Sequence, residues 1–552
     1  MKQSTNVTNI LFMAAFSGLL IGFNLASMTG ILDVMKFSSD PTVPFQREML
    51  ASMIPFGSIM GALVTWLIVD QFGAPLTLGW ATLVWAIGSG LMANSGGLTL
   101  LIFGRGIAGV GGRMLSAIVP AYMVEIAPKE SRGSYMSLLY LFISLGILLI
   151  NGIQFMATRL LGDKFSGSDP LNDPRPVVYA LRISYLLQAI PGLAFLLFTM
   201  FLPNSPYHLA YKGRWREAHE LMAALENRRR TDSKLLAHFE QMRQEIQARR
   251  RDGPPQLRML FRPSERYKLI LGMFTQLWNQ LCGIHVFLYH TTWAIGSAGV
   301  AWFHLAVFFI YLFNILSTAM SGSILPDGVG RRWTLMAGSI VITSCLVTMG
   351  VVQDVFTKLN LGDLEGTYFD DIPYVIQNPG ASNAVMVLAS LFIVTYAATW
   401  GPTSWTYSTE ILPPYLRSRG VALCMVSYWV GNLIMSLAVP RMLMRFDAKI
   451  YYLFALFNFF TFWHVAAEVH ETEGGPLEEM DDLFNSGRFA WEKQPRGVKF
   501  DFLVSRFENQ FENHPAVVGN TAAAAGPEQD DIELESMDGN TITNTITNGA
   551  AV

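Results

Sequence analysis

The sequence carries one charged pattern twice, far apart along the chain. Residues 125–133 read EIAPKESRG, and residues 410–420 read EILPPYLRSRG. The glutamate, proline and arginine have the same spacing in both copies, and only the final glycine is displaced, by two residues. A repeat of this kind predicts a chain built from two related halves.

Long apolar segments fill both halves. Of the 552 residues, 51% are hydrophobic and only 15% are charged, which favours a membrane protein over several soluble domains. A membrane-crossing helix needs about 20 mostly apolar residues, and the apolar run at the N-terminus is too long for a cleaved signal. Twelve segments qualify, near residues 10–30, 48–69, 76–94, 98–125, 134–158, 178–202, 267–294, 301–324, 333–352, 383–408, 418–442 and 447–467. The sequence therefore predicts an all-α membrane protein with twelve transmembrane helices in two pseudo-symmetric six-helix halves.

Charge along the chain divides it into four parts. Residues 204–268 hold 15 of the 39 Lys and Arg residues, so the positive-inside rule places this stretch, and with it both termini, in the cytoplasm. Its sequence has helical apolar spacing, which predicts short amphipathic helices, although a solvated linker is the alternative. The polar C-terminal stretch is predicted to be disordered. The predicted parts are an N-terminal half (1–202), a cytoplasmic linker (203–266), a C-terminal half (267–484) and a disordered cytoplasmic tail (485–552).

Other functional classes find little support in the sequence. It has no phosphate-binding Gly-rich loop, no metalloprotease His pair and no nucleophile elbow, so we expect no enzyme, no cofactor and no bound metal. The three cysteines lie in apolar segments, away from any metal-ligand pattern. The basic linker is interleaved with acidic residues, so we expect no nucleic acid partner. The expected partners are the lipid bilayer and a small solute, and the expected state is a monomer.

The fourth apolar segment is rich in small residues. Gly106, Gly109, Gly111 and Gly112 would weaken a helix in water, but in a membrane they let neighbouring helices approach closely. Arg105 lies within the same segment, where a cation is costly and therefore a functional candidate.

Several motifs occur in an order that resembles one family. The match runs from about residue 10 to 485, and the motifs are GLLIGFNLASMTG, DQFG at 70–73, the two repeated patterns, PNSPYHLAYKGRWREA, QLWNQLCGIHVFLYH, DGVGRR at 327–332, GPTSW and ETEGGPLEEMDDLF. Together they resemble the sugar porter family of the major facilitator superfamily, in its fungal form. The resemblance implies a secondary transporter that moves a sugar or related polyhydroxylated solute by alternating access, and it favours the plasma membrane.

Substrate-binding candidates follow from the residues and from the resemblance. Gln276, Asn279 and Gln280 share one face of a helix, and carboxamides can bond hydroxyl groups, although bonding between helices is the alternative. His285 would point away from that face unless the helix bends near Gly283, as it does in the family. The Gly401-Pro402 pair interrupts the tenth segment beside a possible site. The resemblance and this break add Trp405, Asn432, Tyr140 and, weakly, Asn314.

A second set of candidates lies at the cytoplasmic helix ends. Their acidic and basic side chains can form ion pairs that close the cytoplasmic side, although they could merely anchor the helix ends. The predicted gating residues are Asp70, Glu125, Arg132, Asp327, Arg331, Arg332, Glu410 and Arg417. The first half has lost several of the family's charges, at Ala74, Pro75, Asn204 and Tyr207, which predicts weaker stabilisation of outward-facing states.

Three positions bear on coupling and substrate charge. Asn24 stands where proton-coupled family members have an aspartate paired with the Arg105 position, which favours facilitated diffusion, unless His285 or His290 carries a proton. Arg113 replaces a family glycine, and a buried cation would suit an anionic substrate such as a quinate-like polyol acid. The alternative is that Arg113 reaches the interface or bonds backbone carbonyls. A non-transporting nutrient sensor is a further hypothesis.

Overall fold

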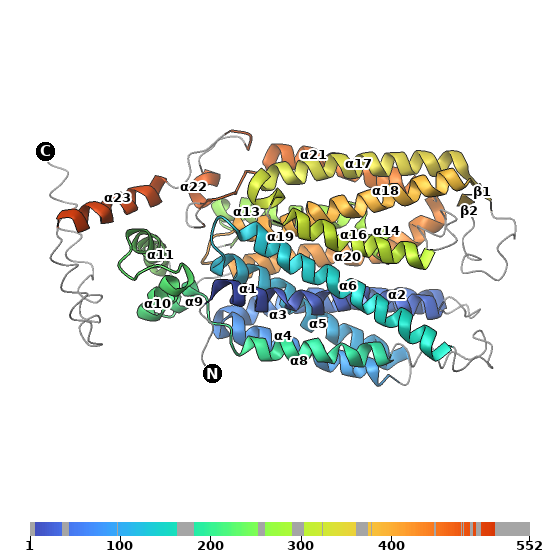
Figure 1. Ribbon diagram of the computed structural model, residues 1–552, viewed down its shortest axis with the longest axis horizontal. Helices are drawn as coiled ribbons and strands as arrows, with labels where there is room; N and C mark the ends of the chain where they lie inside the picture. The colour runs from blue at the N-terminus through green and yellow to red at the C-terminus, as the bar shows by residue number, and fades with distance from the viewer. Residues whose placement is uncertain are drawn as a thin grey trace.

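The computed structural model describes residues 6–513 except for short gaps. The gaps are 36–42, 96–97, 163–181, 252–259, 290–302, 323, 360–373, 377, 447–448, 476, 478–479, 486–489 and 493–497. Two helical bundles lie side by side along their length (Figure 1). This two-halved arrangement is the one that the repeated charged pattern predicts.

The first bundle holds the N-terminal half. Its helices are α1 (Val7–Ala15), α2 (Ser17–Met35), α3 (Val43–Phe72), α4 (Ala74–Ala93), α5 (Leu98–Ile126), α6 (Arg132–Gly162) and the span Arg182–Thr199, which contains α8 (Ala189–Thr199).

The second bundle holds the C-terminal half. Its elements are α13 (Pro263–Leu281), α14 (Ile284–Tyr289), α16 (Phe303–Ser321), the short π-helix η2 (Leu325–Val329), α17 (Arg331–Phe356), the hairpin β1 (Thr357–Leu359) and β2 (Tyr374–Ile376), α18 (Pro379–Ala398), α19 (Trp400–Glu410), α20 (Arg417–Phe446) and α21 (Lys449–Glu468). The two bundles meet mainly where α20 packs on α3 and where α6 packs on α16 and α19.

Eleven helices of the described chain are long and apolar enough to cross a membrane. The predicted seventh helix is not among them, because α13 carries charged and amide side chains and ends at a break around Gly283. Gly283 has a φ of 94°, a left-handed conformation that glycine adopts without strain. The bend predicted near Gly283 is therefore present.

The tenth predicted helix is also broken, slightly earlier than the sequence indicates. The break lies at Thr399, with φ −119° and ψ −82°, and α19 starts at the next residue. Pro402 falls in the first turn of α19, where its missing N–H costs no helical hydrogen bond. The Gly401-Pro402 pair thus begins the second helix rather than interrupting one.

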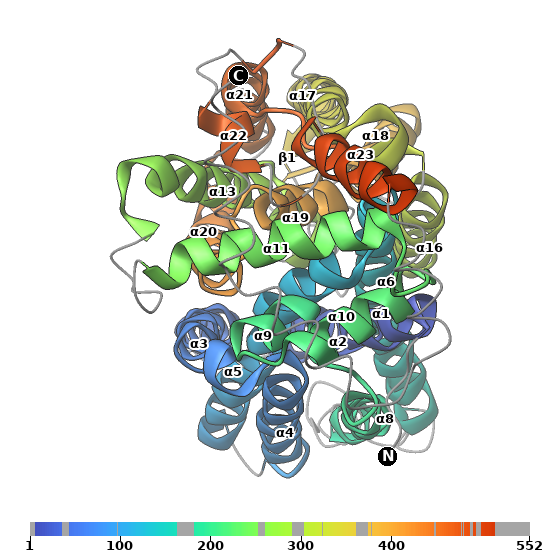
Figure 2. The same cartoon turned by 90° about the vertical axis from the view of Figure 1, so that its left-hand side faces the viewer.

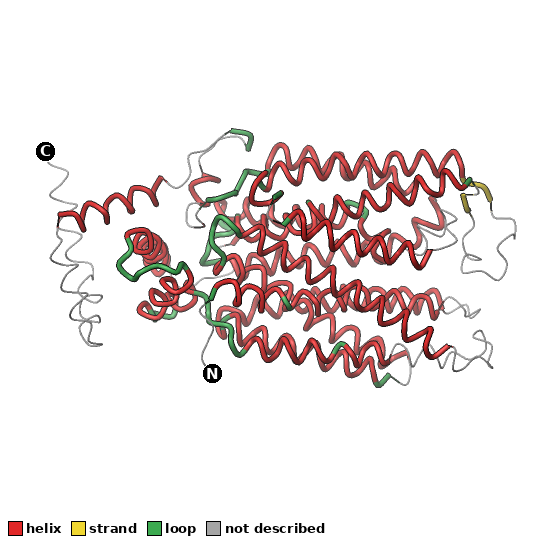
Figure 3. Tube along the Cα trace, in the orientation of Figure 1, coloured by secondary structure: helices red, strands yellow, loops and turns green. Residues whose placement is uncertain are grey.

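Short helices gather at one end of the two bundles. The linker forms α9 (Pro206–Tyr211), α10 (Trp215–Leu225) and α11 (Ser233–Arg251), and Figure 2 shows them across the ends of the long helices. We call this end of the molecule the linker end. The β1–β2 hairpin lies at the opposite end (Figure 3).

The C-terminal tail forms α22 (Met480–Asn485) and α23 (Val498–Asn513). The apolar side of α23 places Leu503 and Val504 against Ala237 of α11, and Lys129 Nζ lies 4.8 Å from the centroid of the Phe500 ring. The prediction of a tail disordered from residue 485 therefore fails for α23, because this segment has an apolar stripe that α11 covers. Residues 514–552 lie outside the described residues.

Helices α4 and α5 touch through their backbones. A Cβ atom on Gly111 would lie 2.3 Å from the backbone nitrogen of Trp85 and 2.6 Å from the carbonyl oxygen of Ala81. No side-chain carbon can lie this close to backbone atoms, so α4 and α5 pack at this distance because residue 111 is a glycine.

We expect Gly111→Ala to lower the thermal unfolding midpoint of the purified protein, because the methyl group forces two backbones apart at a cost of about 1–3 kcal/mol. Gly106→Ala, in the same helix, is the matched control, since a Cβ there meets nothing within 4 Å. Equal unfolding midpoints for the two variants would contradict the close contact.

Candidate functional site

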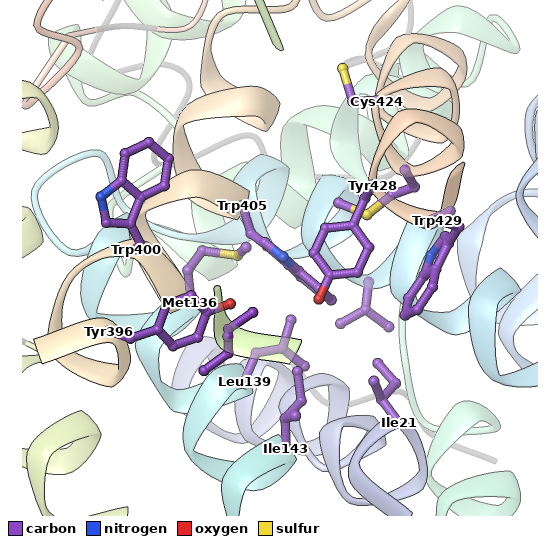
Figure 4. Packing of buried hydrophobic residues seen from close by; sticks show 14 of the residues in the cluster. Ile21, Met136, Leu139, Ile143, Tyr396, Trp400, Trp405, Cys424, Tyr428 and Trp429 are labelled. Carbon is purple, nitrogen blue, oxygen red and sulfur yellow. The ribbon is translucent and has the colours of Figure 1, made fainter. Parts of the chain in front are cut away.

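Aromatic side chains of the C-terminal half gather where the two halves meet. The Trp405 and Tyr428 rings are 5.9 Å apart and perpendicular, and the Tyr428 and Trp429 rings are 4.6 Å apart. In the view of Figure 4, Trp405 and Tyr428 lie on the side of Leu139 and Ile143 of α6, and Trp429 lies nearer to Ile21 of α2. Trp405 is buried and belongs to α19, the helix of the second half that packs on α6, so this predicted site residue lies near the boundary between the halves.

The predicted amides of α13 are all buried, and two of them bond to α19. Gln276 Nε2 donates to Ser408 Oγ at 2.7 Å and to the Ser404 carbonyl at 3.1 Å. Asn279 Nδ2 donates to Ser404 Oγ at 2.7 Å and to the Trp400 carbonyl at 3.0 Å. The NH₂ groups of these two amides therefore form bonds between helices, which was the alternative to binding a substrate.

Gln280 joins the predicted residues His285 and Asn432. Gln280 Oε1 lies 2.8 Å from His285 Nε2 and accepts a hydrogen bond from Asn432 Nδ2 at 3.1 Å. The break at Gly283 is what turns His285 back toward Gln280. His290, the other histidine considered for proton transfer, lies outside the described residues.

Several buried polar atoms of the predicted site and coupling residues, and one of Trp429, have no hydrogen-bond partner among the described residues. They are Gln276 Oε1, Asn432 Oδ1, Asn24 Oδ1, Asn314 Oδ1 and Trp429 Nε1. A buried polar atom left without a partner costs about 1–3 kcal/mol, and a site that binds hydroxyl groups needs such acceptors and donors. Four of the five are amide oxygens, which accept hydrogen bonds from hydroxyl groups.

Tyr140 of α6 reaches across the boundary to α19. Its ring lies so close to Gly401 that a Cβ atom there would be 2.5 Å from Tyr140 Cζ. Its ring centroid is 6.4 Å from that of Tyr396, whose hydroxyl donates to Asn279 Oδ1 at 2.8 Å. Tyr140 therefore lies beside the polar network, and its role in substrate binding stays a prediction.

Arg113 also contacts the opposite half. It is fully buried, its guanidinium carbon lies 3.8 Å from the centre of the Trp429 ring, and its Nε donates to Ser58 Oγ at 3.2 Å. A cation over a tryptophan face is held by the ring's electron density. Stacking on Trp429 was not among the alternatives that the sequence suggested for Arg113.

Asn24 and Arg105 hold neighbouring helices against α5. Asn24 Nδ2 donates to the Ala108 carbonyl at 2.8 Å, and Arg105 Nε donates to the Leu50 carbonyl of α3 at 3.1 Å. Among the contacts of the described residues, Asn24 therefore joins the first membrane helix to α5. The bond from Arg105 instead ties α5 to α3.

At the linker end, the second half keeps a dense set of charges. Arg331 donates to Glu410 through Nε (3.1 Å) and Nη2 (2.8 Å), and its Nη2 lies 3.2 Å from Asp327. Glu410 also accepts from Thr472 Oγ1 at 2.6 Å. Arg332 Nη2 donates to the Ala466 carbonyl at 2.8 Å. All of these bonds lie within the C-terminal half.

Asp327 in addition caps a helix of the other half. Its carboxylate accepts from the backbone N–H groups of Gly133 (2.8 Å) and Ser134 (2.6 Å), and from the Ser134 hydroxyl (2.6 Å). These residues are the first turn of α6, where unpaired N–H groups and the helix dipole favour an anion. Arg132 Nη1 adds a bond to the Gly475 carbonyl at 3.0 Å, again between the halves.

The first half places its acids against cations of the second half. Arg417 Nη1 lies 3.6 Å from Glu125 Oε1, and Arg419 Nε lies 2.6 Å from Asp70 Oδ2. The linker end is therefore closed by contacts between the halves.

Several residues that take part in these contacts were not among those predicted from the sequence. Arg419 lies two positions after Arg417, and a search for cations beside the repeated pattern would have found it. Ser404 and Ser408 lie one turn apart on α19, and Tyr396 precedes the break. Glu471, which accepts from the backbone N–H groups of Arg331 and Arg332, lies in the closing motif.

Two helical bundles with a polar network and aromatic rings at their boundary define a membrane carrier of the major facilitator type. The model of the family described as "Sugar (and other) transporter" matches residues 10–484. The chain belongs to this family of multi-pass membrane proteins.

Individual relatives agree with this assignment. The chain is 34% identical over 538 residues to "MFS glucose transporter mfs1" of Aspergillus flavus, covering 96% of this chain and all of the relative. It is 25% identical to "High-affinity gluconate transporter ght3" of Schizosaccharomyces pombe, covering 88% of this chain and 85% of the relative. Its fold is similar to that of the proton:xylose symporter XylE from E. coli, with a TM-score of 0.73 at 19% identity over 87% of this chain and 99% of XylE.

We expect Asp327→Asn to favour opening of the linker end, because the α6 terminus loses its anion, worth about 0.3–2 kcal/mol, and Arg331 loses an ion-pair partner. Pulsed EPR between spin labels at two exposed residues, Gln71 of the first half and Arg266 of the second, measures the separation of the halves.

Asp354→Asn is the control for this variant. Asp354 is exposed and lies near the end of α17 that leads to the hairpin. The Asp354→Asn variant should therefore give the same spin-label distance distribution as the parent protein. An Asp327→Asn distribution equal to that of the control would contradict the capping role.

Proposed function

We propose that this protein carries a neutral sugar across the membrane by alternating access. The observation that carries the proposal is the set of buried amide oxygens without partners, from Asn24 of one half and from Gln276, Asn432 and Asn314 of the other. A sugar presents several hydroxyl groups, each of which can donate to one of these oxygens. The adjoining rings of Trp405 and Tyr428 offer the apolar faces on which a pyranose ring can lie.

The polar network explains how such a site keeps its shape. The NH₂ groups of Gln276, Asn279 and Asn432 are held by bonds within the C-terminal half, so their oxygens have fixed directions. Groups fixed in advance lose little entropy when a ligand binds. We infer that the C-terminal half supplies most of the binding groups, and that Asn24 and Tyr140 complete the site from the N-terminal half.

We place the linker end in the cytoplasm, on the positive-inside rule. The 15 Lys and Arg residues of 204–268 then lie inside, and both termini do as well. Because the halves touch at the linker end, the structure corresponds to a state that is closed toward the cytoplasm. We propose the plasma membrane as its location, which the resemblance to the fungal form of the family favours.

Transport in this proposal is facilitated diffusion. The family's protonatable aspartate is replaced by Asn24, whose side chain donates to the Ala108 carbonyl. An amide does not exchange a proton near neutral pH.

A polyhydroxylated carboxylate, such as a gluconate-like or quinate-like acid, is the second candidate substrate. Arg113 stacks on Trp429, which precedes Asn432 by one turn of α20. A cation at this position favours an anionic ligand. The gluconate transporter among the relatives supports this candidate.

We expect the purified protein in liposomes to take up labelled glucose at a rate that an inward proton gradient does not change. Asn432→Leu should reduce uptake by about tenfold or more, because it removes a hydroxyl acceptor from the site. Leu433→Ala, at the next position of α20, serves as the control.

Other outcomes of this experiment have distinct meanings. Uptake driven by the gradient would exclude facilitated diffusion. The absence of uptake for glucose, gluconate and quinate would contradict transport and favour a nutrient sensor.

Arg113→Gly tests the choice between neutral and acidic substrates. If the acid is the substrate, this variant should lose gluconate or quinate uptake by about tenfold or more while glucose uptake is less affected, since one ion pair to a buried cation is lost. Competition between labelled glucose and unlabelled gluconate measures the preference. An unchanged preference in the variant would exclude the acid candidate.

A further inference from the structure

The two halves of the chain differ in one side chain at equivalent places. In the second half, Gly330 is followed by Arg331, the first residue of α17. In the first half, Gly73 is followed by Ala74, the first residue of α4. The two glycines have similar backbone angles, φ 96° and ψ 160° against φ 78° and ψ 165°. The backbones are therefore alike, and the first half has a methyl group where the second half has a guanidinium group.

In the second half, three groups surround the guanidinium group of Arg331. Glu410 accepts two hydrogen bonds from it, at 2.8 and 3.1 Å, and the Pro326 carbonyl accepts one at 2.6 Å. Asp327 Oδ1 lies 3.2 Å from Arg331 Nη2. Two carboxylates and a carbonyl of one half thus form a guanidinium site.

The equivalent groups of the first half border a cavity. By the repeated pattern, Glu125 corresponds to Glu410. By their spacing to the glycine, Val69 and Asp70 correspond to the proline and the aspartate of the second half's site. These three residues and Ala74 line one cavity with a volume of about 60 Å³. The cavity is therefore bordered by the counterparts of the groups that surround the guanidinium group in the second half.

The size and the walls of the cavity suit a small planar cation. A water molecule needs about 10–15 Å³ of such space, so the cavity has room for about four of them. A guanidinium ion, which consists of a carbon and three nitrogens, has a similar number of non-hydrogen atoms. Four of the lining residues are the tyrosines Tyr122, Tyr207, Tyr211 and Tyr415, and aromatic faces attract guanidinium groups.

The two acids already have partners, but those of Glu125 are weak. Arg419 Nε of the opposite half lies 2.6 Å from Asp70 Oδ2. Arg417 Nη1 lies 3.6 Å from Glu125 Oε1, which is farther than a hydrogen bond, and two other nitrogens of Arg417 donate to carbonyls of its own half. Glu125 also accepts from the Ser205 hydroxyl, a neutral group. A buried carboxylate is costly unless a cation lies close to it, so a further cation stabilises Glu125.

The cavity wall adds no positive charge of its own at neutral pH. Besides the two acids and the tyrosines, its titratable residue is His208. Burial, together with the nearby Lys212 and Arg214, lowers the pKa of His208, so its ring is uncharged at neutral pH. The ring therefore does not repel a cation in the cavity.

We propose that this cavity binds a small cytosolic cation with a guanidinium group, which bonds Glu125 and Asp70 as Arg331 bonds the acids of the second half. The guanidinium group donates N–H bonds to the two carboxylates, and charge-assisted bonds of this kind are strong and directional. The cytosolic origin of the ligand rests on the proposed orientation of the linker end.

Binding at this place favours the closed linker end. The cavity wall includes Pro414, Tyr415 and Ser418 of the second half, so the cavity is complete only while the halves are in contact. A ligand that binds one of two states better shifts the protein toward that state. The bound cation therefore holds the linker end closed and, under alternating access, slows transport.

Thermal unfolding of the full-length protein tests for the site without a transport assay. We expect guanidinium chloride at about 10–50 mM to raise the unfolding midpoint by about 1 °C or more relative to potassium chloride at the same concentration, because a ligand bound to the folded protein stabilises it. Potassium chloride matches the charge and the ionic strength but not the planar shape.

Three variants assign the effect to the cavity. Ala74→Arg supplies a guanidinium group from the chain and should remove the difference between the two salts. Glu125→Gln removes one carboxylate without adding bulk and should also remove most of it, so it remains informative if Ala74→Arg fails to fold. Glu130→Gln, at an exposed acid of the same half outside the cavity wall, is the matched control and should keep the response of the parent protein.

Pulsed EPR in lipid nanodiscs tests the effect on the linker end. Spin labels at the exposed positions Glu130→Cys and Arg266→Cys report the separation of the halves, and the three native cysteines are buried. The ratio of closed to open protein should rise with guanidinium, by about tenfold at ten times the Kd.

Three results would overturn the proposal. They are equal unfolding midpoints of the parent protein in the two salts, a Glu125→Gln variant with the parent's response, and an increase of the open state when guanidinium is added. Guanidinium binding by a protein that moves no sugar would contradict the proposed function alone. Sugar uptake by a protein that shows no guanidinium effect would contradict this site alone.

Discussion

A charged or polar group within the membrane part of a protein has to find its partner inside the protein, and this constraint organises the whole structure. The lipid offers no hydrogen bonds, so each buried arginine, carboxylate or amide joins the helices that supply its partners. Arg331 and Glu410 join helices of one half, whereas Glu125 and Arg417 join the two halves. The choice of partner therefore decides which parts move together and which can separate.

The same constraint separates rigid from adaptable parts of the site. Gln276 and Asn279 of α13 donate to α19, and Gln280 of α13 accepts from Asn432 of α20, which joins three helices of the C-terminal half around Asn279 and Gln280. The N-terminal half contributes fewer and different groups, among them Tyr140 and Arg113, and both lie against residues of the opposite half. In the proposed site, we therefore expect substitutions in the N-terminal half to alter selectivity while the hydrogen bonds of the C-terminal half are kept.

Much of this arrangement could be predicted from the sequence, because helical spacing and charge pattern are local properties. The shared face of Gln276, Asn279 and Gln280 is an example, whereas the bend near Gly283 was implied by the resemblance to the family. Contacts between distant segments could not be predicted in this way, since no spacing rule places Arg113 on Trp429 or Arg419 on Asp70. The helix in the tail was missed for a related reason: the apolar stripe of α23 is short, and it is covered only because α11 lies beside it.

The start of α6 has a consequence for the motion of the protein. Its first N–H groups are capped by Asp327, which belongs to the other half, so this helix does not supply its own cap. When the halves separate, those groups have to turn to water, and the first turn of α6 loses an important restraint. Opening therefore converts an ordered helix end into a fraying one, and the entropy gained there offsets part of the lost contact energy.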